Sequence, residues 1–93
     1  MIIGVLQLDI FIPQANSLKS KRQVLKSLKD RIRHKFNVSV AEINSLDKWQ
    51  KATFAVACLN SQKRSIDSIL SEIVPLVQSY HSVELVDYTI ELI

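Results

Sequence analysis

Residues 18–36 read LKSKRQVLKSLKDRIRHKF, and this stretch decides the fold of the chain. At about 100° per residue its apolar side chains fall on one stripe, which predicts a long amphipathic helix over Leu18–Phe36. The stripe comprises Leu18, Leu25, Leu28, Ile32 and Phe36, with Val24 at its edge. Ser17 is a suitable N-cap because its hydroxyl can accept a hydrogen bond from a free backbone amide. Asn37 is suited to end the helix in the left-handed conformation.

The segments on either side of this helix alternate apolar and polar residues with the period of a half-buried strand. One strand is predicted over Ile3–Ile12 and ends at Pro13, which cannot donate a ladder hydrogen bond. After the helix, a second strand is expected to point Val38 and Val40 inward. Turn residues at 44–48 then join it in a hairpin to a third strand over 49–59, whose inward residues are Ala52, Phe54, Val56 and Cys58.

The last third of the chain predicts one more helix and one more strand. Asn60 or Ser61 can cap the helix, and Pro75 is expected to kink or shorten it. Its apolar stripe is Ile66, Ile69, Leu70, Ile73 and Val77. The final strand, over 83–92, is expected to point Val86, Tyr88, Ile90 and Leu92 into the core.

The predicted order is β-α-β-β-α-β, and right-handed crossovers then give a ferredoxin-like sandwich of the α+β class. A four-stranded antiparallel sheet would carry both helices on one face and leave the other bare. The 93 residues fit a single domain, 1–93, and a hydrophobic content of 47% with one Gly and two Pro excludes a disordered chain. The N-terminal apolar run is too short to span a bilayer, so no membrane partner is expected.

Cysteine and histidine usage gives no sign of a metal or redox centre. Cys58 is the single cysteine and cannot form an internal disulfide, which favours a reducing, cytoplasmic location. His34 and His81 lie far apart without ligand spacing. Asp9, Asp87 and Glu91 could cluster on neighbouring strands, but without a nucleophile or nearby His they do not predict an enzyme. We therefore expect no catalytic, cofactor-binding or metal-binding residue and no small-molecule ligand.

Charge is distributed unevenly along the chain. Residues 17–36 hold eight Lys or Arg and one Asp, while the remainder holds four basic and eight acidic residues. Five cations occupy an arc of about 80° beside the apolar stripe, and they are Lys19, Arg22, Lys26, Lys29 and Arg33. The repulsion among like charges at i,i+3 and i,i+4 costs about 1–2.5 kcal/mol. A polyanion-binding face would explain that cost, and a solvated face whose cations pair with the protein's own acids is the alternative. Lys21, Arg31 and Lys35 are assigned to the other side of the stripe.

The bare face of the sheet is the second candidate surface. It lacks the aromatic platforms that sheet-based RNA recognition uses. Its small residues instead suit close approach of a second copy of the chain, and the predicted interface residues are Phe11, Thr53, Ala55 and Ala57. A solvated sheet face is the alternative here.

Three stretches, SLKSKRQVLKSL (17–28), FNVSVAEI (36–43) and DKWQKA (47–52), resemble the YlxP-like family, domain of unknown function 503. Family members typically read Ser-Leu-Lys-Asp-Lys-Arg, and Ser20 stands here in place of the acid. The resemblance implies a ferredoxin-like fold in a small bacterial cytoplasmic protein. Genes of this family sit, in some genomes, near translation-initiation and ribosome-maturation genes, which points to RNA or the ribosome. The family carries no established activity.

Two functions of different classes follow from these observations. The leading hypothesis is a non-enzymatic binding protein that contacts RNA or a ribonucleoprotein through its basic first helix, as a monomer or a homodimer. The alternative is a protein-interaction or homodimerisation module that acts through the open sheet face, with the basic helix merely solvated.

Overall fold

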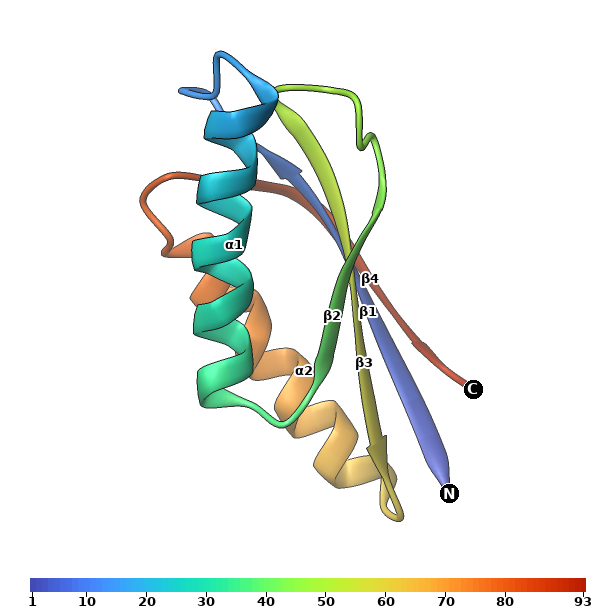
Figure 1. Cartoon of the computed structure of the whole chain (residues 1–93). Helices are drawn as coiled ribbons and strands as arrows, with labels where there is room; N and C mark the ends of the chain where they lie inside the picture. Colours follow the sequence, from blue (N-terminus) through green and yellow to red (C-terminus); the bar gives the residue numbers. More distant parts are fainter.

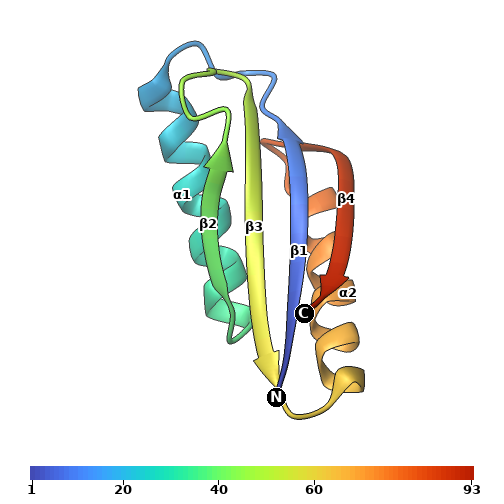
Figure 2. The same ribbon diagram turned by 90° about the vertical axis from the view of Figure 1, so that its right-hand side faces the viewer.

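The computed structural model describes residues 1–93 and contains six regular elements in the predicted order. They are β1 (Ile2–Phe11), α1 (Leu18–Lys35), β2 (Ser39–Asn44), β3 (Lys51–Asn60), α2 (Lys63–Gln78) and β4 (Glu84–Leu92). The strands form one antiparallel sheet in the order β2-β3-β1-β4. Both helices cover one face of this sheet (Figure 1), and the other face is open (Figure 2). The predicted α+β, ferredoxin-like sandwich is confirmed.

The first helix begins where the sequence predicts, through a capping box. The Ser17 hydroxyl accepts a hydrogen bond from the Ser20 amide at 3.0 Å, and the Ser20 hydroxyl accepts one from the Ser17 amide at 3.3 Å. These two bonds satisfy amides that the first turn of a helix leaves free. Ser20 therefore performs the capping role open to an acid at that position.

The end of α1 differs from the prediction. Phe36 leaves the helix in an extended conformation, with φ −132°, while its amide still donates to the Ile32 carbonyl at 2.9 Å. The non-glycine residue with positive φ is Ser45, in the turn after β2, and the expected left-handed Asn37 is wrong. Because the backbone is already extended at Phe36, β2 follows directly, and the side chains of Val38 and Val40 pack against the core.

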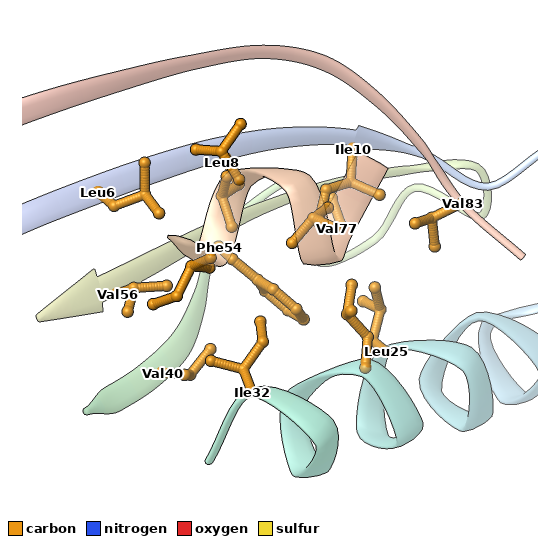
Figure 3. Close-up of a cluster of buried hydrophobic side chains, with 14 of the residues drawn as sticks. Leu6, Leu8, Ile10, Leu25, Ile32, Val40, Phe54, Val56, Val77 and Val83 are labelled. Carbon is orange, nitrogen blue, oxygen red and sulfur yellow. The ribbon is translucent and has the colours of Figure 1, made fainter. Parts of the chain in front are cut away.

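The core lies between the sheet and the two helices, with Phe54 of β3 at its centre (Figure 3). Phe54, Leu8 and Ile32 are fully buried, and β1, α1 and α2 all contribute to the same cluster. The chain's one glycine, Gly4, lies in β1 beneath α2, where a Cβ would overlap Ile66 Cγ2 and lie 3.0 Å from Leu70 Cδ1. Glycine is required here because α2 approaches the strand so closely.

The last strand corrects one core assignment. Opposite β1, Ile10 pairs with Leu85 and Asp9 pairs with Asp87, so Val86 is the extra residue of a β-bulge. Val86 is 69% exposed and borders the open face of the sheet rather than the core, while Leu85 takes the inward position. Three further residues do face the helix side, but they lie on the edge strand and stay 38–45% exposed, namely Tyr88, Ile90 and Leu92.

The second helix also differs from the prediction at its start. Its N-cap is Gln62, which makes no side-chain capping bond, and Asn60 instead accepts a hydrogen bond from the Gln62 amide at 3.0 Å. The cap predicted at Asn60 or Ser61 is therefore wrong. The helix continues past Pro75 to Gln78, and its predicted apolar stripe faces the sheet.

Candidate nucleic-acid interface

A groove of about 350 Å³ lies between α1 and β2, and four of the five cations predicted to bind a polyanion line it. Its lining comprises Arg22, Leu25, Lys26, Lys29, Asp30, Arg33, Glu42 and Phe54. The fifth predicted cation, Lys19, lies one turn nearer the start of α1 and is exposed. The helical arc predicted from the sequence is thus a real ribbon of cations along one side of α1, which we call the basic ribbon.

Most of the basic ribbon has no acidic partner in the protein. Lys26 lies 2.9 Å from Asp30 in an exposed i,i+4 pair, and that hydrogen bond lowers the pKa of the Asp30 carboxyl. Arg33 donates to the Val40 carbonyl at 2.8 Å, which fixes its guanidinium at the edge of the sheet without cancelling its charge. No carboxylate lies within 4.0 Å of the three other cations, Lys19, Arg22 and Lys29.

Three acids of β1 and β4 lie on the other side of the molecule. The register of β1 and β4 places Asp9 opposite Asp87, and Glu91 lies on the same, open face of the sheet. The sheet therefore separates these carboxylates from the basic ribbon, which runs along a helix on the covered face (Figures 1 and 2). These three acids do not pair with the ribbon within one chain, and Glu42 of β2, which lines the groove, is paired with Lys21.

Lys21 does not flank the ribbon as predicted, because it is buried. Its side chain is 1% exposed, its ammonium lies 2.9 Å from Glu42 Oε2, and it donates to the Ser45 carbonyl at 2.7 Å. No hydrogen bond with favourable angles reaches that Glu42 oxygen, so the contact is an ion pair. Lys21 thus joins α1 to β2 and to the turn that follows it.

The position of Lys21 in the sequence already indicates that this side chain is buried. Position 21 precedes Leu25 by four residues and Leu28 by seven, so on the helical wheel it falls inside the apolar stripe. A lysine inside such a stripe is buried and needs an anionic partner. Glu42 on the neighbouring strand provides that partner.

A second and larger cavity, of about 520 Å³, lies beyond the start of α1. Two loops form it, and its lining comprises Ala15, Asn16, Lys48, Trp49, Gln50 and Lys51. Two hydrogen bonds hold these loops together, from the Ile12 amide to the Gln50 carbonyl at 2.9 Å and from Gln50 Nε2 to the Pro13 carbonyl at 3.1 Å. Trp49 is 54% exposed, so it does not close the core as a lid.

The residues predicted as an interface lie together on the open face, but they are not equally accessible. Thr53 is 7% exposed and donates its hydroxyl hydrogen to Asp9 at 3.1 Å. Phe11 and Ala55 are half-buried, and Ala57 is exposed. Their role as an interface stays a prediction.

Cys58 lies in the core, and burial raises the pKa of its thiol. The structure contains no group of three or more His, Cys, Asp or Glu side chains arranged to hold a metal ion. Neither helix combines the length and the apolar character needed to cross a bilayer.

Solved structures define the class of this fold. The chain superposes over its whole length on the designed protein Foldit4 with a TM-score of 0.57, covering 97% of that chain at 9% identity. It also superposes on the designed protein LFR1 1, described as having a ferredoxin fold, with a TM-score of 0.56, covering 84% of that chain at 12% identity. This is a small ferredoxin-like α+β domain.

Sequence comparison places the chain within this class. A family model described as "Protein of unknown function (DUF503)" matches residues 3–90. The "Uncharacterized protein YlxP" of Bacillus subtilis (strain 168) is 35% identical over 83 residues, which cover 89% of this chain and 90% of that protein. The chain belongs to the DUF503 family.

Proposed function

We propose that this protein is a non-enzymatic RNA-binding module that holds the phosphate backbone of RNA, free or in a ribonucleoprotein, along the basic ribbon. The observation that carries the proposal is that most cations of the basic ribbon form no ion pair within the protein. Arg22 and Lys29 line the groove without forming an ion pair, and the hydrogen-bond partner of Arg33 is an uncharged backbone carbonyl.

The energetics of α1 support the same conclusion. An isolated ribbon of like charges, with four pairs at i,i+3 or i,i+4, costs about 0.8–2 kcal/mol at low salt, and Asp30 is the one acid that forms an ion pair with it. A bound chain of phosphates would remove that repulsion and release condensed counterions as well. At 1.5 Å per residue the ribbon from Lys19 to Arg33 extends about 21 Å, long enough for several consecutive phosphates.

Fluorescence anisotropy with a labelled RNA oligonucleotide tests the proposal. If about five phosphates are neutralised on a single strand, affinity should fall on the order of 100-fold between 50 and 200 mM salt. The paired change Arg22→Glu and Lys29→Glu should abolish binding at 100 mM salt, since neither side chain forms an ion pair within the protein.

A charge-matched control separates the ribbon from net charge. Lys63→Glu with Arg64→Glu alters the net charge equally but lies at the start of α2, and both side chains are exposed. This control should keep most of the affinity. Equal loss in both double variants would reduce the effect to net charge, and absence of binding by the wild type to any cellular RNA pool would end the proposal.

Self-association is the second candidate, and the observation that favours it lies at the edge of β4. β2 and β4 are the two edge strands of the sheet. On β2, Arg33 donates a hydrogen bond to the Val40 carbonyl, whereas no side chain bonds a carbonyl of β4. The mutual hydrogen bonds of Ile3 and Ile93 place the amides of Ile90 and Leu92 on the free side of β4 by alternation. Beside these amides lie the partly exposed apolar side chains of β4, namely Tyr88, Ile90 and Leu92. Free ladder groups next to apolar side chains are a template for another strand.

If the second strand belongs to another copy of this chain, charge favours one register of the pairing. In an antiparallel pairing centred on Ile90, Tyr88 lies opposite Leu92 of the second copy and Thr89 lies opposite Glu91. Centring the pair on Thr89 instead would oppose Asp87 and Glu91, which is unfavourable. The Tyr88 amide already donates to Asp87 at 2.8 Å, so the ladder would rest on Ile90 and Leu92.

Sedimentation equilibrium and cysteine cross-linking test this candidate. Ile90→Arg should turn a dimer into a monomer, and Ala55→Arg, on the open face, should not. Ile90→Cys should form a disulfide across the two-fold axis, while Thr89→Cys should not, because only position 90 meets itself. A wild type that is monomeric at high concentration, or a dimer lost only in Ala55→Arg, would exclude the β4 edge.

A further inference from the structure

We infer that Trp49 is a stacking platform for an unpaired base, so that the preferred RNA is single-stranded. This inference rests on the proposed function and names its substrate class. Trp49 lines the larger cavity with Lys48 and Lys51 beside it, and 54% of its surface is exposed. A solvent-exposed indole with cations lining the same cavity is the combination that single-strand binding sites use.

The cavity continues the line of the basic ribbon. Asn16 lines the cavity and directly precedes Ser17, the N-cap of α1, and Lys19 follows in the first turn. Figure 2 shows the start of α1 and the β2–β3 loop side by side at the same end of the molecule. At 1.5 Å per residue, Lys19 lies only about 3 Å along the helix axis from Ser17, the residue that follows Asn16. A strand whose phosphates follow the ribbon would therefore bring its next base to Trp49.

The loop that carries Trp49 is held in place from both ends. Before it, the Ser45 carbonyl accepts the hydrogen bond from the buried Lys21, and after it Gln50 bonds to both Ile12 and Pro13. These bonds hold the indole beside α1 before any ligand arrives. Because the loop is already ordered, less of the free energy of stacking is lost in ordering it on binding.

Polar groups in the cavity suit the edge of a base. The exposed Asn16 side-chain amide makes no hydrogen bond within the protein, although the Asn16 backbone amide donates to Ser20. Gln50 uses its Nε2 on Pro13, which leaves its Oε1 as an acceptor. A planar base stacked on the indole would place its edge within reach of these groups. A duplex cannot supply such a base without opening, because its bases are already stacked and paired.

The chain has one tryptophan, so tryptophan emission, excited selectively over the two tyrosines, reports on this site alone. The experiment titrates the protein with an eight-nucleotide adenosine RNA, the same strand annealed to its uridine complement, and inorganic polyphosphate. The single strand should quench the emission, and the duplex and polyphosphate should bind the ribbon with little quenching. Trp49→Ala should weaken the single strand about 5- to 150-fold, while Trp49→Phe keeps most of the affinity.

Leu46→Ala is the matched control, because Leu46 is 59% exposed in the same loop but does not line the cavity. It should leave all three affinities unchanged, and circular dichroism should show that each variant folds. Two results together would overturn the stacking platform and leave the proposed function standing: wild-type emission that the single strand does not quench, and full single-strand affinity in Trp49→Ala. Failure of all three polyanions to bind the wild type would overturn both. A DNA strand of the same sequence tests whether the ribose hydroxyl contributes.

Discussion

The buried Lys21–Glu42 pair should be worth far more to stability than any other charge in the protein. Replacing Lys21 by Met keeps the length of the side chain and removes its ammonium. This leaves Glu42 without a counter-ion and the Ser45 carbonyl with one donor, the Lys48 amide, instead of two. Breaking a buried pair costs roughly 3–5 kcal/mol. Glu42 retains 18% side-chain exposure, and water can therefore recover part of that loss. We expect the free energy of unfolding to fall by about 2–4 kcal/mol.

Urea and thermal denaturation followed by circular dichroism measure this change. For a domain of this size the loss corresponds to a fall in Tm of roughly 10–25 °C. Lys19→Met, at an exposed position of the same helix, should change stability by less than about 0.5 kcal/mol. A double-mutant cycle with Glu42→Gln should show coupling above about 1 kcal/mol, because the second change removes the charge that the first leaves unpaired. Additive effects, or a loss in Lys21→Met no larger than in Lys19→Met, would refute the reasoning.

Three further predictions concern the helix start, the helix–sheet contact and the buried thiol. Ser20→Asp should raise the free energy of unfolding by about 0.5–1 kcal/mol in urea titrations, since the first turn of α1 carries no acid; no gain at low salt would contradict this. Gly4→Ala should lower it by about 1–3 kcal/mol, because the new methyl group overlaps Ile66, whereas the same change with Ile66→Val should recover part of the loss. Cys58 should resist alkylation in the folded protein and react on unfolding, because burial raises the pKa of its thiol. The unfolded chain therefore loses this proton first, so Cys58 should lower stability as pH rises above about 8.5, and Cys58→Ala should remove that dependence.

Periodicity predicted the elements because each one buries a single face. The apolar stripe of α1 and the alternation of β3 are both imposed by the core, and both are confirmed. The bulge at Val86 could not be predicted in this way. One extra residue shifts the phase of a strand, and the choice between Leu85 and Val86 depends on pairing with β1, which a local pattern does not contain.

The candidate site was predictable to a similar depth. The angular position of Arg22 and Lys29 follows from the helix repeat, but their lack of an ion-pair partner depends on how the strands place their acids. The prediction that Lys21 flanks the apolar stripe is wrong: the helix repeat places it inside the stripe, where a cation is uncommon, and its side chain is buried. The cavity at Trp49 brings together two loops more than 30 positions apart in the chain, and no local pattern links them.

The buried Lys21–Glu42 pair also connects the stability of the protein to its proposed binding of single-stranded RNA. The Lys21 ammonium holds the Ser45 carbonyl, and Ser45 begins the loop that carries Trp49. Lys21→Met should therefore loosen the indole while the ribbon, on the adjacent arc of α1, keeps its cations. We expect that variant, tested below its unfolding temperature, to lose single-strand affinity and quenching more than polyphosphate affinity. Equal losses for the two ligands would mean that the Lys21–Glu42 pair supports the whole helix. Unchanged quenching would mean that the bonds of Gln50 and the Lys48–Ser45 turn hold the loop without Lys21.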